Sequence, residues 1–212
     1  MLDTICDVMK EAYKREWIST RDGNASFKRK NENFLYVTPS GVKKQHMNSE
    51  MMIKLKIEQN GDLTRVDDEY QRKITGLEPT GEIYLHMLLQ KNLQDNRVVI
   101  HLHPTYIIAA MYAGLDLQEL ARQFPEINRY TRVGPSVPVI EPISKELALE
   151  SVRKLNLNEK TGKVDFDIIG LKQHGIIALG KDAWTAFEHC ERLEHICKIA
   201  LTGGLNGYIK HL

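Results

Sequence analysis

The sequence has few cysteines, no long apolar run and almost no net charge, and each of these absences excludes a class of protein. The 212 residues contain three cysteines, Cys6, Cys190 and Cys197, an odd and sparse set that indicates reduced thiols rather than a disulfide framework. The N-terminal stretch carries acidic residues and does not resemble a signal peptide, so we expect a cytoplasmic protein. No apolar run reaches the roughly 18 residues that a membrane span needs, so we expect no membrane partner.

The charge balance excludes strong electrostatic attraction to nucleic acid or to an anionic membrane. The chain has 29 lysines and arginines against 28 acidic residues, a formal net charge of +1. Apolar residues make up 42% and charged residues 27%, which is ordinary for a soluble globular protein. No internal repeat or linker is present, so we expect a single α/β domain over residues 1–212.

The hydrophobic periodicity predicts helices and strands along the whole chain. We expect helices over residues 2–18, 82–91, 107–112, 117–124, 146–155 and 184–201. We expect strands over residues 25–27, 33–38, 52–57, 63–66, 97–103 and 136–140. Residues 168–179 predict either a pair of strands or one bent strand that is interrupted at His174-Gly175.

The sharpest chemical signal is the pair His101 and His103, at the end of the apolar segment VVIHLH. Residues i and i+2 of a strand point to the same side, so both imidazoles project together. Two neutral imidazoles suit a divalent metal, most often zinc, and His174 is a third candidate ligand from a distant segment. Two solvated histidines and a hydrogen-bonded core histidine are the alternatives that these motifs leave open. His86, on the inner face of the helix predicted over residues 82–91, has no assigned chemistry.

Glu82 and three short loops are the other candidate functional elements. A carboxylate at the start of the predicted helix is either a favourable first-turn acid or a general base close to a metal-bound substrate. The loops contain small residues and hydroxyl groups, and their backbone N–H groups could hold an anion such as phosphate. They are Asp22-Gly23-Asn24, Pro39-Ser40-Gly41 and Thr80-Gly81. Each of them is also compatible with an ordinary turn.

Taken together, these segments resemble the class II aldolase/adducin family, and its sugar-phosphate aldolases in particular. The resemblance covers about residues 5 to 201, and its motifs are GNAS at Gly23, TPSG at Thr38, PTGE at Pro79, VVIHLH at Val98 and QHGIIALG at Gln173. It implies a three-layer α/β/α fold around a central, mostly antiparallel sheet.

The resemblance also implies roles for individual residues. His101, His103 and His174 match the ligands of one zinc ion per subunit, and Glu82 matches the catalytic acid/base. The residues that match the phosphate-binding loops are Gly23, Asn24, Ser40, Gly41, Thr80 and Gly81. Gly81 departs from the pattern, because related aldolases more often carry a second hydroxyl there. Tyr130, expected in a loop before Pro138, is the candidate for proton transfer at the aldehyde oxygen, and Tyr208 is a second candidate that could reach a neighbouring subunit.

The activity that the resemblance implies is reversible cleavage of a ketose 1-phosphate, L-fuculose 1-phosphate or similar. The products would be dihydroxyacetone phosphate and an aldehyde such as L-lactaldehyde, with zinc as the Lewis acid. Relatives are homotetramers, so we expect the same here. Two reactions of the same fold stay open, dehydration of methylthioribulose 1-phosphate and 4-epimerisation of ribulose phosphate. A non-enzymatic, adducin-like interaction domain is disfavoured, because such domains typically lack the metal ligands.

Overall fold

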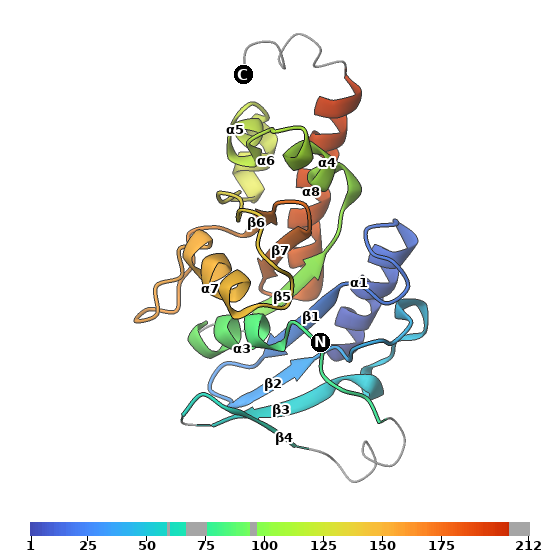
Figure 1. Ribbon diagram of the computed structural model, residues 1–212, viewed down its shortest axis with the longest axis vertical. Helices are drawn as coiled ribbons and strands as arrows, with labels where there is room; N and C mark the ends of the chain where they lie inside the picture. Colours follow the sequence, from blue (N-terminus) through green and yellow to red (C-terminus); the bar gives the residue numbers. More distant parts are fainter. Residues whose placement is uncertain (59, 67–75, 94–96, 204–212) are drawn as a thin grey trace.

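Seven antiparallel strands form one sheet in the computed structural model, which describes residues 1–58, 60–66, 76–93 and 97–203 (Figure 1). The strand order is β4-β3-β2-β1-β5-β7-β6, and each neighbouring pair is antiparallel. The strands are β1 Asn24–Lys28, β2 Phe34–Val37, β3 Ile53–Ile57, β4 Leu63–Arg65, β5 Arg97–Leu102, β6 Ile168–Leu171 and β7 Gly175–Gly180. The sheet confirms the predicted α/β class.

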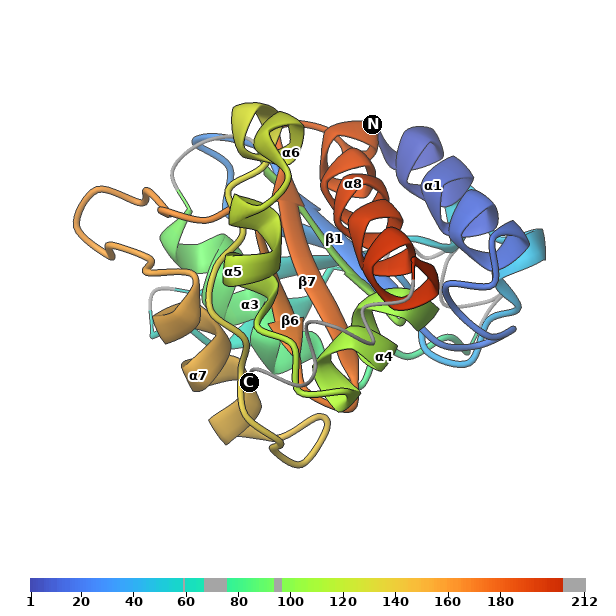
Figure 2. The same ribbon diagram turned by 90° about the horizontal axis from the view of Figure 1, so that it is seen from above.

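Helices cover both faces of the sheet and complete the three expected layers (Figure 2). One face packs against α1 Leu2–Lys14, α4 Thr105–Tyr112, α5 Leu117–Arg122, α6 Pro125–Tyr130 and α8 Ala183–Thr202. The other face packs against α3 Ile83–Asn92 and α7 Lys145–Lys154. Two short 3-10 helices, η1 Lys44–His46 and η2 Ser49–Met51, precede β3. The alternation of side chains in β5 explains the layering. Val98 and Ile100 pack on the face covered by α8, and Val99 packs on the face covered by α3 and α7.

The first helix ends four residues earlier than the periodicity predicts, and its end positions part of the site. Glu16 adopts a left-handed conformation with φ of 60°. The N–H groups of Glu16 and Trp17 donate to the carbonyl oxygens of Tyr13 and Ala12, the hydrogen bonds of a Schellman motif. The chain then turns toward the sheet, where the Trp17 carbonyl accepts a hydrogen bond of 2.7 Å from the N–H of His103.

Two sequence predictions are corrected between residues 117 and 140. The strand predicted over residues 136–140 is wrong, because Pro135 and Pro138 remove backbone donors and leave only an isolated bridge between Val137 and Leu171. The helix predicted over residues 117–124 ends at Arg122, and a separate helix, α6, begins with Pro125 at its first position.

The remaining element predictions agree with the structure to within a few residues. Residues 168–179 form the pair of strands β6 and β7 rather than one bent strand, and the turn between them contains Gln173 with a φ of 59°. The three cysteines are buried free thiols. Within the described residues, we find no helix with the length and apolar character required to cross a membrane.

Candidate active site

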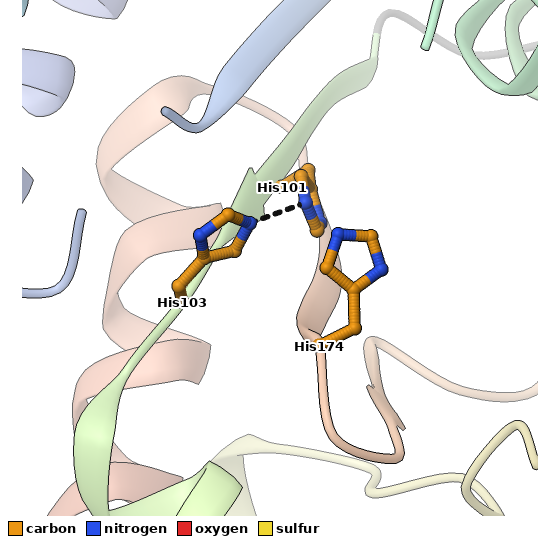
Figure 3. A group of neighbouring side chains, drawn as sticks. All are labelled: His101, His103 and His174. Carbon is orange, nitrogen blue, oxygen red and sulfur yellow. Dashed lines mark hydrogen bonds between the residues drawn. The ribbon is translucent and has the colours of Figure 1, made fainter. Parts of the chain in front are cut away.

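Three histidines converge where β5 ends beside the turn between β6 and β7 (Figure 3). His101 pairs with Ile177 across the sheet, so the turn that precedes β7 brings His174 to the end of β5. Nε2 of His103 lies 2.8 Å from Nε2 of His101, and the rings of His101 and His174 have centroids 4.7 Å apart. One candidate ligand atom from each of the three residues lies within 4.8 Å of the others.

The surroundings of the three imidazoles suit a divalent metal ion. His101 donates from Nδ1 to the carbonyl oxygen of Ile176 at 2.9 Å, which leaves the lone pair of Nε2 directed at the other histidines. Burial, and then the neighbouring histidines, lower the pKa of both His101 and His103 to about 3, so both rings are neutral at physiological pH. Nδ1 of His174 is buried and has no hydrogen-bond partner among the described residues. Two neutral imidazoles that converge with a third, which carries an unpaired nitrogen, fit a metal-binding site.

Gly175 lets the two strands approach closely enough to assemble this cluster. A Cβ at this position would overlap the carbonyl oxygen of Leu102 and lie 2.8 Å from Cδ2 of His103. Both neighbours belong to the segment that carries the histidine pair. The glycine after His174 is therefore required by the packing of β7 against β5.

Glu82 lies beside the histidines at the N-terminal end of α3 and is 6% exposed. Its two carboxylate oxygens lie 3.4 Å from Nε2 of His101 and 3.7 Å from Nε2 of His174. Nδ2 of Asn24 donates to Oε2 of Glu82 at 3.4 Å. Burial raises the pKa of Glu82, against the opposing effects of His174 and of the Asn24 hydrogen bond. A buried carboxyl group with a raised pKa is suited to accept and donate a proton.

A pocket of about 230 Å³ opens in front of Glu82 and the histidines. Its lining includes every residue of the predicted phosphate-binding set, namely Gly23, Asn24, Ser40, Gly41, Thr80 and Gly81. Two backbone hydrogen bonds join the loop of Ser40 to the loop of Thr80. The N–H of Ser40 donates to the Glu78 carbonyl, and the N–H of Thr80 donates to the Thr38 carbonyl. The first loop requires glycine, because Gly23 has a φ of 68° and a Cβ there would lie 2.6 Å from the side chain of Ile18.

Tyr130 is not where the sequence analysis expected it. It is the last residue of α6 rather than part of a loop, and its side chain is 51% exposed. It lines a separate groove between α6 and α8, and it is absent from the described lining of the histidine pocket. A role in proton transfer would therefore need the pocket of a neighbouring subunit. Tyr208 lies outside the described residues.

The pocket also contains an isoleucine that the sequence analysis did not identify. Ile143 lines the pocket with 62% of its surface exposed, and its φ is 67°. A left-handed conformation is a genuine outlier for a β-branched residue, and nothing in the local sequence signals it. A Cβ added to Gly81 would lie 3.1 Å from Cδ1 of Ile143, so the isoleucine fills the space over Gly81.

The burial of Lys44 was not predicted from the sequence, because a lysine in a polar segment normally indicates a solvated side chain. Here Lys44 is fully buried. Its Nζ donates to the carbonyl oxygens of Arg21 and Val42 at 3.1 and 3.3 Å, so it joins the loop before Gly23 to the loop after Ser40. Burial lowers the pKa of Lys44 to about 8.

Comparisons with known proteins identify the family and agree with the fold. The family model described as the class II aldolase and adducin N-terminal domain matches residues 3–201. An L-fuculose phosphate aldolase of Methanococcus maripaludis is 29% identical over 92% of this chain and 91% of its own. A methylthioribulose-1-phosphate dehydratase of Komagataella phaffii is 23% identical over 93% of this chain and 80% of its own. The solved L-fuculose-1-phosphate aldolase of Thermus thermophilus superimposes with a TM-score of 0.71 at 20% identity, covering 95% of this chain and 94% of that one.

Proposed function

This chain belongs to the class II aldolase and adducin family, and from that premise we propose that it is a zinc-dependent lyase that cleaves a ketose 1-phosphate. L-Fuculose 1-phosphate is the proposed substrate, with dihydroxyacetone phosphate and L-lactaldehyde as products. The observation that carries the proposal is the convergence of three histidines and one buried carboxyl group on a small pocket. The lining of that pocket includes backbone and hydroxyl groups from three loops together with the basic residue Arg21, which suit an anionic substrate.

His101, His103 and His174 are the residues that would hold the zinc ion. When bound, zinc supplies a Lewis acid that stabilises negative charge on the oxygens of the substrate. The hydrogen bond from His101 to Ile176 keeps one imidazole in a fixed tautomer and orientation for this purpose.

The three loops would orient the substrate through its phosphate group. The backbone N–H groups of Gly41 and Gly81 donate to no other described residue, and Ser40 and Thr80 add hydroxyl groups from the same two loops. Holding the phosphate fixes the reacting carbon atoms beside Glu82, which contributes by positioning. Ile143 covers Gly81, so a side-chain donor at position 81 is replaced by an apolar wall.

Glu82 would perform the proton transfer at C3 of the substrate. Its carboxyl group is buried beside the histidines, where water is largely excluded and the raised pKa favours transfer in both directions. The proton at the aldehyde oxygen needs another group, and the described lining of the pocket contains no tyrosine.

Because the described pocket lining offers no tyrosine for the aldehyde oxygen, a second candidate reaction is favoured. It is the dehydration of a ketose 1-phosphate such as methylthioribulose 1-phosphate. In a dehydration, Glu82 could remove the C3 proton and return a proton to the departing hydroxyl group, so a single carboxyl group suffices. The two reactions differ in their products, because only the aldolase breaks a carbon–carbon bond.

The test is a panel of ketose 1-phosphates supplied to the zinc-loaded protein, with release of dihydroxyacetone phosphate measured by coupled reduction to glycerol phosphate. Glu82→Gln should lower kcat by about 100-fold or more and should abolish deuterium exchange on dihydroxyacetone phosphate, while zinc stays bound. Glu78→Gln is the matched control, because Glu78 lies on the same segment with 77% of its side chain exposed. Normal exchange in Glu82→Gln would remove Glu82 from this role, and water loss without carbon–carbon cleavage would favour the dehydratase.

We also propose, from the resemblance alone, that the protein acts as a homotetramer in the cytoplasm. Light scattering coupled to size-exclusion chromatography measures the number of subunits directly.

A further inference from the structure

Polar side chains form a row behind the pocket, between α3 and β1. Glu82, His86 and Gln90 recur at every fourth residue, so they share one face of α3 and its first turn. Asn24 and Ser26 share the face of β1 that packs on α3. Ser26, His86 and Gln90 have no exposed surface at all. Buried polar groups are costly unless they are bonded to one another, so this row indicates a role beyond packing.

The hydrogen bonds in the row have one direction, which a backbone carbonyl determines. Nε2 of Gln90 donates to the Arg97 carbonyl oxygen at 3.0 Å and to Oγ of Ser26 at 3.1 Å. Because a carbonyl only accepts, the Gln90 amide cannot be turned over. Ser26 can then give its own proton to Nδ1 of His86, 2.7 Å away. The His86 ring therefore carries its proton on Nε2, which lies 2.5 Å from Oδ1 of Asn24.

The same chain of hydrogen bonds determines which end of the Asn24 amide faces Glu82. Burial, and then His101, lower the pKa of His86 to about 3, so the ring is neutral and holds a single proton. Asn24 uses its oxygen for His86 and so presents its NH₂ group to Oε2 of Glu82 at 3.4 Å. In the opposite tautomer the Asn24 amide would turn over, and its oxygen would face the carboxylate of Glu82. Two acceptors would then oppose each other in a buried site.

We propose that His86 is a positioning residue, which holds the Asn24 amide with its NH₂ group toward Glu82 and thereby orients the carboxyl group that transfers the proton. This inference rests on the proposed function for the role of Glu82. The orientation of the amide follows from the hydrogen bonds alone and can be tested without any activity.

The first test is the protonation state of His86 in the zinc-loaded protein, by two-bond ¹H–¹⁵N correlation of ¹⁵N-histidine-labelled protein. The signals that His86→Gln removes identify the residue. We expect the neutral ring with its proton on Nε2. A ring protonated on Nδ1, or on both nitrogens, would overturn the proposal.

The second test compares kcat, KM and zinc content of His86→Leu and His86→Gln. Leucine cannot donate to Asn24, so we expect kcat to fall by about 100-fold, the effect of a misplaced catalytic group, with KM and zinc content within about threefold. Glutamine has an amide N–H that can reach Asn24, and it should restore kcat to within about tenfold. His195→Leu, on an exposed histidine of α8, is the control and should leave all three values unchanged.

A folded His86→Leu protein with kcat within threefold of the wild type would refute the proposal, as would a His86→Gln protein as slow as His86→Leu. If His86→Leu does not fold, the tautomer of His86 in the wild-type protein remains the deciding measurement, and a proton on Nδ1 would refute the proposal. If the wild-type protein has neither lyase nor exchange activity, the proposed function is wrong, while the tautomer of His86 still confirms or refutes the orientation of Asn24.

Discussion

Replacement of Lys44 by methionine should change how the stability of the protein depends on pH. Lys44 is fully buried, and within the described part of the chain its ammonium group meets two backbone carbonyls and no carboxylate at hydrogen-bonding distance. Burial lowers its pKa to about 8 from 10.5, partly opposed by the charge of Asp22. The folded protein therefore binds this proton less tightly than the unfolded chain does.

The sign and the size of the effect follow from this difference in pKa. Below pH 8 Lys44 is charged in both states, and the folded state carries the full cost of burying the charge. Between pH 8 and 10.5 the unfolded chain keeps more protons, so the free energy of unfolding rises with pH. From pH 7 to pH 9.5 the rise amounts to ~2 kcal/mol. Methionine has a similar length and no charge, so Lys44→Met should lack this rise.

Urea unfolding of both proteins at pH 7 and at pH 9.5, with the metal removed by a chelator, measures the effect. All other titrating groups are common to the two proteins. Their effects cancel when the pH-dependent change in the free energy of unfolding of one protein is subtracted from that of the other. Lys43→Met is the matched control, because Lys43 is the exposed neighbour and should behave like the wild type. A difference between Lys44→Met and the wild type that stays constant with pH to within about 0.5 kcal/mol would show that Lys44 does not titrate in this range.

Three further outcomes test the site. His103→Ala should lower the zinc content after dialysis to less than about a tenth of an ion per chain, measured by atomic emission, since two imidazoles form an incomplete site; full occupancy would exclude this ligand. Gly175→Ala should lower both the zinc affinity and, by about 4 °C or more, the melting temperature in calorimetry, because the added Cβ overlaps the carbonyl of Leu102; an unchanged melting temperature would contradict the packing described. Tyr130→Phe should leave kcat within about threefold, because Tyr130 lies outside the pocket of its own chain; a 100-fold loss would instead assign it to the site of a neighbouring subunit.

The parts of the site that could be predicted from the sequence are those that depend on local periodicity. The alternation of a strand is enough to place His101 and His103 on one side, and the structure has them 2.8 Å apart. The approach of His174 depends on the pairing of β7 with β5, which no local pattern specifies. The sequence alone made His174 a candidate ligand, and the resemblance to a family assigned it to the same site as the pair.

The parts that could not be predicted depend on long-range burial. The row Glu82, His86 and Gln90 has a four-residue repeat that is visible in the sequence, but its meaning depends on the polar face of β1 that packs on it. Lys44 has the composition of a surface residue, and only the convergence of two loops on its ammonium group makes it buried. The strand expected over residues 136–140 does not form for a local reason, because Pro135 and Pro138 lack the backbone N–H groups that a strand would use.

The left-handed backbone of Ile143 connects the strain stored in the protein with the width of its pocket. A left-handed backbone costs a β-branched residue about 1–2 kcal/mol that glycine would not lose. A change to glycine at this position would therefore relieve the backbone strain and widen the pocket in one step. The side chain over Gly81 would also have to shift by a few tenths of an ångström to admit a larger residue there, since its Cδ1 lies 3.1 Å from the site of an added Cβ. Positions 81 and 143 thus share one volume, so a larger residue at position 81 needs a displaced or a smaller side chain at position 143.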